Sequence, residues 1–453
     1  MDSDGRLPVG VKLGWAVGEL AIAAFVVLQM GFMLFYATEA MRIPPAIAGV
    51  ALLVPRLLDA LADPLMGAIS DRTKSRLGRR RLYLLIGAPL LGVTFGAVFF
   101  VPSDAPLTLR VALLVIAFMA SNAAVTIYEV PYSAMAAEMT PSYKERTSLT
   151  GYKMFAARLG GVLCAFGAPI IFGSQDSLAG GFRLLGATIC VFMIVTGLWA
   201  YFATASAPRI EQTPHRFSLR DEIKAVIENR SFCTLWIAFF FQNLAIGAAA
   251  TTLIYFVTQV MRVAPQGAAP FMAVGGIVAM IATPLWVAVG RMIGKQRGYY
   301  AGLLIAGAMS VPALFIAPSQ APLLLAILVV AGIGDAATQL FPNAMAPDTV
   351  EVDEVKSGLR REGAIFGAWG FCRKLGMTGG AFIVSLALSA IHFMPGEAPS
   401  LQPESAITGI RYIYAAVPLG LWLAALVAFT LYDLSEARFE ALKLQIRERR
   451  GRA

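Results

Sequence analysis

The chain carries little charge. Only 14% of its 453 residues are Asp, Glu, Lys or Arg, and 58% are hydrophobic, whereas about a quarter of the residues of an average soluble protein are charged. The mean hydropathy is +0.69. This composition excludes an ordinary soluble protein and predicts a membrane protein.

Histidine and cysteine are also scarce. With only His215 and His392 there is no HExxH pair, and the chain has no GxSxG sequence, Walker-type phosphate loop or cysteine metal cluster. The four cysteines lie within or at the edges of apolar runs, which implies no disulfide framework: Cys164, Cys190, Cys233 and Cys372. We therefore expect neither an enzyme nor an ATP-driven pump, no catalytic residues and no cofactor. An ion gradient is the remaining source of work.

Long apolar stretches recur along the whole chain. Each of twelve stretches is long enough to cross about 30 Å of hydrocarbon. The first should be retained rather than removed as a signal peptide, because few charges and no small-residue cleavage site accompany it. The fold class we predict is an all-α membrane protein of twelve transmembrane helices. The spans are 12–37, 45–69, 82–101, 108–138, 149–172, 182–205, 232–260, 267–290, 298–317, 321–345, 363–392 and 408–432.

The positive charge is distributed asymmetrically. If the N-terminus is inside, inner segments hold 27 of the 37 Lys and Arg residues, outer segments hold five, and five lie in the spans. This asymmetry predicts that both termini are cytoplasmic. It also assigns the net charge of +9 to contacts with membrane lipids rather than nucleic acid. We interpret the basic run Arg76 to Arg81 as an anchor that fixes orientation.

A short pattern occurs twice, once in each half of the chain. "PLMGAISDR" begins at Pro64 and "PLWVAVGRMIGKQR" at Pro284, and each leads into a basic loop. The match favours a parallel duplication of six spans. In the longest inner gap, Ser218 and Asp221 resemble a capping box that opens a short helix. We therefore predict four parts: an N-terminal six-helix bundle (1–206), a cytoplasmic linker (207–231), a C-terminal six-helix bundle (232–434) and a basic cytoplasmic tail (435–453).

Three charged residues interrupt the second span. Each of Arg56, Asp59 and Asp63 costs about 2.5–3.5 kcal/mol in mid-membrane, a penalty that indicates a use. Asp59 and Asp63 lie four residues apart and share a helix face, and Pro64 cannot donate to the carbonyl of Ala60. Two carboxylates beside a free carbonyl suit a small cation or a shared proton. The alternative is a salt bridge between Arg56 and Asp59 that only joins helices.

The fourth span repeats the device in "TIYEVP". Thr126 and Glu129 share a helix face, and Pro131 frees the carbonyl of Ile127. The alternative is a glutamate that a nearby lysine neutralises. In the eleventh span Arg373 and Lys374 lie about 100° apart around the helix, so only one can readily face the acids.

Further polar residues in the spans are candidates for either packing or solute contact. They are Glu19, Lys153, Arg158, Asp335, Gln242 and Asn243.

Together the motifs resemble the glycoside-pentoside-hexuronide:cation symporters, the family of the melibiose permease in the major facilitator superfamily. "RLLDALADPLMGAISDRTKSRLGRRR" resembles the second helix and following loop of that family, and the resemblance extends over nearly all spans through "KLGWAVGEL", "IYEVPYSAM", "ERTSLTGYKMFAARLGG" and "PDTVEVDEVKSGLRREG". It implies alternating access, with cation-site acids at Asp59 and Asp63, the helix IV threonine at Thr126 and the helix XI lysine at Lys374.

The chain departs from the family at other positions. Ala62 replaces an asparagine, which leaves Na⁺ and H⁺ both open as the coupling ion. The family's sugar-binding residues correspond to Ala23, Glu129, Ser133 and Met154, so most of its sugar clamp is missing. A related branch carries lysolipids with the same acids and a less polar pocket, and a lysolipid or other amphipathic solute is therefore the alternative substrate.

We predict a symporter that couples uptake of a small solute, of the sugar, glycoside or uronate class, to Na⁺ or H⁺. The cation site would contain Asp59, Asp63 and Thr126, with the two acids as ligands of Na⁺ if sodium is coupled. We expect a monomer in a bacterial-type inner membrane. Contacts with solute, or coupling to it, are assigned to Glu129, Lys374, Glu19, Lys153, Arg158 and Asn243.

Overall fold

A computed structural model describes residues 7–140, 142–208, 227–357, 362–436 and 438–442. Within these ranges the chain is helical and contains no β-strand. Twelve helical segments of the described chain are long and apolar enough to cross a membrane, which confirms the twelve predicted spans. The capping box at Ser218 and the last eleven residues of the tail lie outside the described residues.

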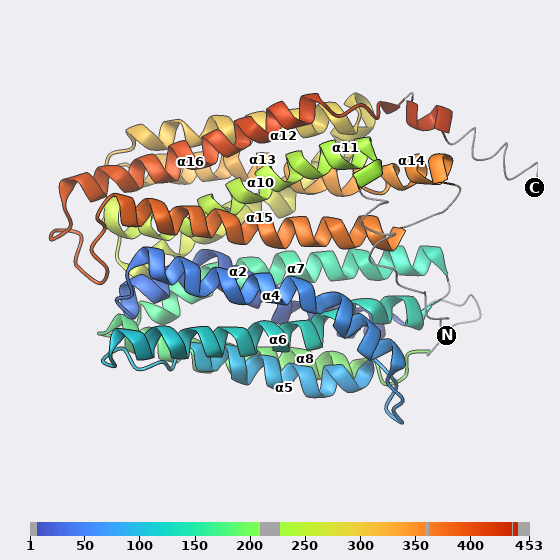
Figure 1. The fold of residues 1–453 in the computed structure, drawn as a ribbon, viewed down its shortest axis with the longest axis horizontal. Coiled ribbons are helices and arrows are strands. Elements are labelled where there is room, and N and C mark those ends of the chain that lie inside the picture. The colour runs from blue at the N-terminus through green and yellow to red at the C-terminus, as the bar shows by residue number, and fades with distance from the viewer. Residues whose placement is uncertain (1–6, 141, 209–226, 358–361, 437, 443–453) are drawn as a thin grey trace, which may run out of the picture. The chain divides into compact units, whose positions relative to one another are not determined.

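The helices follow one another along the chain as Figure 1 shows. The first span consists of α1 (Val9–Val17) and α2 (Glu19–Gly31), and α3 (Met33–Phe35) and the π-helix η1 (Tyr36–Ala40) continue it. The next five spans are α4 (Pro45–Arg72), α5 (Arg81–Val98), α6 (Leu107–Met139), α7 (Tyr143–Phe172) and α8 (Leu178–Ala203).

The later helices repeat this order. They are α10 (Arg230–Tyr255), the π-helix η2 (Phe256–Val260), the 3₁₀ helix η3 (Pro265–Ala268), α11 (Ala269–Ile293), α12 (Lys295–Ser310), the 3₁₀ helix η4 (Pro312–Phe315), α13 (Ala321–Met345), α14 (Asp348–Ser357), α15 (Glu362–Ala390) and α16 (Glu404–Thr430).

By its internal contacts the chain forms two compact units. Unit 1 contains the described residues up to 208 together with Val257–Ala273 and Ser385–Ala406. Unit 2 contains the described residues of 227–256, then Val274–Val384 and the chain from Ile407 onward. Unit 1 therefore combines the first six spans with two segments from the later part of the sequence.

Aromatic packing fills the core of each unit. In unit 1, Phe182 of α8 stacks on Phe172 of α7 with ring centroids 4.6 Å apart and on Phe99 at 5.8 Å. In unit 2, Phe239 of α10 stacks on Trp369 of α15 at 3.9 Å. Such ring pairs contribute about 0.5–1.5 kcal/mol beyond the area they bury, and they fix how neighbouring helices meet.

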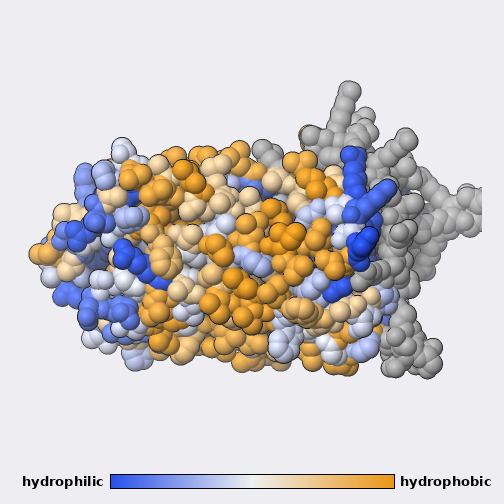
Figure 2. Space-filling view, turned by 90° about the horizontal axis from the view of Figure 1, so that it is seen from below, coloured by the Kyte–Doolittle hydropathy of each residue, from blue (hydrophilic) through white to orange (hydrophobic). Residues whose placement is uncertain are grey.

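Apolar side chains also cover the outside of the spans. Figure 2 shows one face on which hydrophobic residues occupy the middle and polar residues gather toward both ends. Large exposed side chains on α5 and α8 include Val93, Val191, Trp199 and Phe202, each more than half exposed. An apolar band between polar ends is the pattern of a membrane-embedded surface.

The repeat that joins Pro64 to Pro284 in the sequence has a counterpart in the structure. The five-residue π-helices η1 and η2 begin at Tyr36 and Phe256, which are separated by the same offset as the two prolines. Arg42 and Arg262, which share that offset, both adopt left-handed backbone angles, with φ of 49° and 55°. Two copies of one local structure therefore end the first and seventh spans.

Candidate cation and solute site

Helices α4 and α6 bring the predicted cation-site residues together. The Thr126 hydroxyl on α6 donates to Oδ1 of Asp59 on α4, and the same hydroxyl lies 3.2 Å from Oδ1 of Asp63. Asp59 is 4% exposed and Thr126 3% exposed. One hydroxyl thus joins two carboxylates in a largely dry environment, in which a nearby positive charge interacts strongly with both.

Arg56 contacts the opposite side of the same carboxylate. Its Nη1 lies 3.4 Å from Oδ2 of Asp59 and donates to Oδ1 of Asn122 at 3.1 Å. Its guanidinium lies 5.8 Å from the centre of the Phe25 ring. The predicted salt bridge therefore exists, and it leaves Asp59 in contact with Thr126. Arg56, Asp59 and Asp63 together carry a formal charge of −1, which one monovalent cation or proton would balance.

Asn122 was not among the predicted residues. It lies one turn before Thr126 on α6, is 1% exposed, and donates through Nδ2 to the carbonyl of Phe118 at 2.7 Å. That bond fixes its amide oxygen toward Arg56. A polar residue four positions before a predicted site residue would have been the signal.

A second polar cluster lies where the first span breaks. Helix α1 ends at Val17 and α2 begins at Glu19. At the break, the hydroxyls of Tyr128 and Tyr132 on α6 donate to the carbonyls of Gly18 and Trp15 at 3.2 and 2.9 Å. A Cβ at Gly18 would lie 2.6 Å from the Tyr128 hydroxyl. Glycine thus permits the close approach that holds the break.

The break places Glu19 in the first turn of α2, opposite Lys153 of α7. Lys153 Nζ lies 3.5 Å from Glu19 Oε2, donates to Ser133 Oγ at 2.8 Å, and is 5.3 Å from the centre of the Tyr132 ring. The lysine side chain is 24% exposed. The resemblance aligns Met154 with a helix V residue of the family's sugar clamp that this chain lacks. Met154 is 62% exposed, and the neighbouring Lys153, which was predicted as a solute contact, is the residue that reaches the cluster.

Two other predicted residues of this unit are partly buried. Glu129 lies one turn after Thr126 on α6, and among the described residues its carboxylate has no hydrogen-bond or ion-pair partner. Arg158 follows Lys153 by five positions on α7. Their contact with solute stays a prediction.

Unit 2 holds the remaining predicted residues. Lys374 is partly buried while its neighbour Arg373 is exposed, as expected for adjacent positions on one helix. Asn243 is fully buried: its Nδ2 donates to the Phe239 carbonyl at 2.7 Å, and its Cβ would lie 2.7 Å from a Cβ at Gly376. The link between Lys374 and the acids, and a solute contact of Asn243, stay predictions.

Two polar residues of the same unit also have defined surroundings. Gln242 accepts from the Tyr299 hydroxyl at 2.7 Å and donates to the Thr338 carbonyl at 3.0 Å, a structural role. Asp335 is partly buried on α13.

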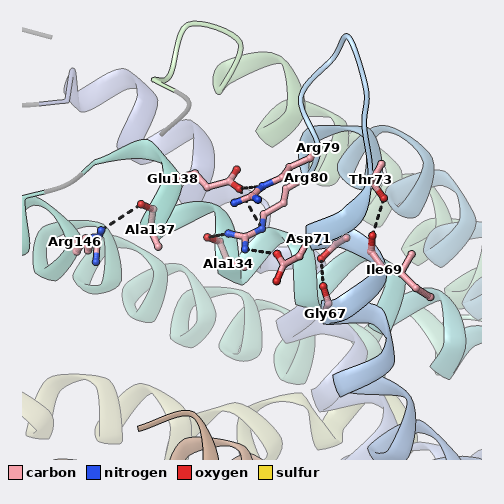
Figure 3. Close-up of polar contacts among 11 residues, drawn as sticks. Gly67, Ile69, Asp71, Thr73, Arg79, Arg80, Ala134, Ala137, Glu138 and Arg146 are labelled. Atoms are coloured by element: carbon pink, nitrogen blue, oxygen red, sulfur yellow. Dashed lines mark hydrogen bonds and ion pairs between the residues drawn. The ribbon is translucent and has the colours of Figure 1, made fainter. Parts of the chain in front are cut away.

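The basic loop after α4 forms a further network (Figure 3). Arg80 pairs with Asp71 at 2.7 Å, donates to the carbonyl of Ala134, and lies 3.4 Å from Glu138, which also accepts from Arg79. Arg80 is 8% exposed. These arginines were interpreted only as an orientation anchor, and the structure adds that they tie the end of α4 to the end of α6.

The sequence family described as "MFS/sugar transport protein" matches residues 14–436. The chain belongs to this family. Its members are membrane transporters, so the chain is a transporter and not an enzyme, and the predicted symporter resemblance is confirmed. Curated relatives agree. An uncharacterized symporter of Synechocystis sp. is 27% identical, and the match covers 98% of this chain and 97% of that protein.

Two relatives from Escherichia coli carry more specific names. A putative glycoside/cation symporter is 27% identical over 98% of this chain and 96% of its own length, and a glucuronide carrier protein homolog is 25% identical over 97% and 95%. Among solved structures, a bacterial homolog of the human lysosomal transporter Spinster matches with a TM-score of 0.67 at 15% identity, covering 96% of each chain. This structural likeness confirms the transporter fold.

Proposed function

We propose that this transporter couples uptake of a sugar, glycoside or uronate to the entry of H⁺ or Na⁺. The observation that carries the proposal is the Thr126 hydroxyl, which hydrogen bonds to both Asp59 and Asp63. Symporters of glycosides and a glucuronide carrier homolog among the relatives support the class of substrate.

The cation binds between the two acids. Before the cation binds, Arg56 balances the negative charge of Asp59. The three residues Arg56, Asp59 and Asp63 then still carry a net charge of −1. A proton on either acid would let Thr126 accept as well as donate, whereas Na⁺ would take the carboxylate and hydroxyl oxygens as ligands. Either cation removes the negative charge whose burial during the transport cycle is costly.

The solute binds beside Lys153. Sugar hydroxyls hydrogen bond to Glu19, Ser133 and the carboxylate of Glu129, and the Lys153 ammonium pairs with the carboxylate of a uronate. A solute that takes over the contact with Lys153 would release Glu19. Breaking this ion pair is therefore the change that solute binding would cause. Arg158, Asn243 and Lys374 complete the proposed contacts, and Lys374 joins the solute to the cation site.

The two six-helix bundles, 1–206 and 232–434, rock about this site during alternating access. In this topology the linker (207–231), the tail (435–453) and both termini are cytoplasmic. The reason is that 27 of the 37 Lys and Arg residues lie in the segments assigned to the inner side. It acts as a monomer in a bacterial inner membrane.

The test compares two matched variants in proteoliposomes. Asp59→Asn removes a site charge with little change of volume, and Asp176→Asn removes an exposed carboxylate outside the site. Ligands are first found by thermal stabilisation with glycosides, uronates and lysolipids, with and without Na⁺ and at two pH values. We expect Asp59→Asn to lose accumulation against a gradient and Asp176→Asn to retain it.

Three outcomes would change the proposal. Accumulation by Asp59→Asn equal to that of Asp176→Asn would remove the acid from the coupling mechanism. Stabilisation by a lysolipid alone would assign an amphipathic substrate instead of a sugar. Stabilisation that depends on pH and not on Na⁺ would identify H⁺ as the coupling ion.

A further inference from the structure

The ends of the first and seventh spans carry similar short sequences. "ATEAMRI" begins at Ala37 and "VTQVMRV" at Val257, at equivalent positions of the repeat. Each contains most of a π-helix, η1 or η2, and each then places an arginine in the left-handed region. The two copies differ at one ionisable position, because Glu39 of the first corresponds to the uncharged Gln259 of the second.

Glu39 and Gln259 are in contact within unit 1. Gln259 Nε2 donates to Oε2 of Glu39 at 3.1 Å. Gln259 is 3% exposed, and its other polar atom, Oε1, has no hydrogen-bond partner in the described parts of the chain. A buried amide oxygen without a partner destabilises the arrangement that contains it. The pair is therefore incomplete while Glu39 is an anion, because a carboxylate has no hydrogen to donate.

A third segment reaches the same carboxylate. The backbone N–H of Gly396, in the connection between α15 and α16, donates to Oε1 of Glu39 at 3.2 Å. Gln402 closes this connection by bonding both the N–H and the carbonyl of Met394 at 3.0 and 2.6 Å. Arg42 lies over Gly396, where a Cβ would come within 2.7 Å of its Cγ. One carboxyl group thus joins three separate segments.

Charged groups surround Glu39 on the elements packed against it. Arg42 and Glu397 act on it from its own loop and from the connection, and Arg262 and Asp104 line the same cavity of about 800 Å³. Glu39 lies beyond the first span, Val9–Gly31. Burial raises the pKa of its carboxyl group to about 8, against the lowering effects of the Gly396 hydrogen bond, Arg42 and Gln259.

We propose that Glu39 is a proton-binding site, separate from Asp59 and Asp63, and that its proton holds the ends of the first and seventh spans together. The protonated acid donates its O–H to Oε1 of Gln259 and accepts from Nε2, so both polar atoms of the amide are satisfied. This contact must open whenever the two span ends separate. The proposal needs no particular solute or coupling ion, so it stands apart from the proposed function.

The direction of the pH effect follows from the difference in the pKa of Glu39 between the closed and the open contact. When the contact opens, Glu39 meets water and its pKa returns toward 4.5. The closed contact therefore binds the proton more tightly than the open one. Its stabilisation is complete below about pH 4.5 and is lost as pH rises to about 8. Between these values the population of the open contact should rise by up to about tenfold per pH unit.

Accessibility of the neighbouring position tests the proposal. Thr258 is 7% exposed and precedes Gln259, so a Thr258→Cys variant should react slowly with a polar maleimide while the contact is closed. Mass spectrometry of peptides separates this label from the four native cysteines. The rate is measured from pH 5.5 to 8.5 and divided by the rate of Thr258→Cys with Glu39→Gln, which cancels the ionisation of the thiol itself.

We expect this ratio to rise at least tenfold between pH 5.5 and 8. Adding Asp104→Asn, an exposed carboxylate of the same cavity, should leave the rise unchanged, and so should adding Asp59→Asn. A ratio that stays constant within twofold over this pH range would overturn the proposal. Loss of the pH-dependent rise in the Asp104→Asn variant would also overturn it, because the effect would then not depend on Glu39 alone. If Thr258→Cys does not fold, Ala40→Cys is the second reporter, since Ala40 is 7% exposed on the other copy.

Discussion

The ammonium group of Lys153 lies 3.5 Å from the carboxylate of Glu19, so this ion pair ties α7 to the start of α2. The Lys153 side chain is 24% exposed, and Glu19 is buried. In the proposed function, a solute with a carboxylate or hydroxyl groups would compete for the Lys153 ammonium. Solute binding would then be coupled to the angle of the broken first span.

Lys153→Met should weaken solute binding by about 10- to 100-fold, because it removes a charged hydrogen-bond donor worth about 1.5–3 kcal/mol. Lys144→Met is the control, since Lys144 is an exposed lysine on the same helix. Binding is measured by solute-dependent thermal stabilisation. Equal affinities in the two variants would remove Lys153 from the solute site.

Thr126→Val should lower cation affinity by about tenfold or more, because it removes the hydroxyl that both acids share. Thr126→Ser keeps the hydroxyl and should restore most of the affinity. Thr94→Val is the matched control, because the Thr94 hydroxyl bonds only to carbonyls of its own helix, Leu90 and Leu91. The measurement is solute uptake against cation concentration or pH. Valine and serine variants that behave alike would contradict the role.

Gly18→Ala should destabilise the protein by about 1–3 kcal/mol, since the new methyl group would overlap the Tyr128 hydroxyl and the Ala200 side chain. A Cβ at Gly10, which lies in α1 of the same span, would meet nothing within 4 Å, so Gly10→Ala should be neutral or slightly stabilising. Thermal unfolding in one detergent compares the two variants. A Gly18→Ala protein as stable as Gly10→Ala would show that the break does not need glycine.

Arg80→Ala should lower stability by about 2–3 kcal/mol, because it leaves Asp71 and the Ala134 carbonyl without this donor. Arg76→Ala removes an exposed arginine of the same loop. It should change stability by less than about 0.5 kcal/mol. Thermal unfolding and protease cleavage of loop 73–80 give two measurements. Similar results for both variants would show that the loop contributes only its positive charge and that the contacts of Arg80 do not stabilise the protein.

Much of the architecture follows from the sequence alone because the membrane imposes a simple rule. Twelve apolar runs had to become twelve helices, and acids four residues apart had to share a face. A polar partner for the two acids was predictable, because a carboxylate is too costly in lipid to lack one. Thr126 was identified as that partner from the helix face it shares with Glu129 and from the resemblance. Neither argument includes Asn122, which is why the sequence analysis missed it.

Rotation about a helix decides which of two neighbouring residues faces the cluster. Residues 153 and 154 of α7 differ by about 100°, so Lys153, the predicted contact, reaches Glu19 while Met154 is exposed. The contacts of the basic loop were hidden for a different reason. An arginine that fixes orientation and an arginine that bridges two helix ends have the same local sequence, and only the positions of Asp71 and Glu138 distinguish them.

The hydrogen bond between Glu39 and Gln259 joins two equivalent positions of the sequence repeat that carry different side chains. In an assembly of two identical halves, the residue at this place would meet its own copy, and two glutamates would set like charges against each other. An amide in one copy turns that repulsion into a hydrogen bond. Such a pair requires the two copies to differ in sequence, which a homodimer of identical chains could not provide.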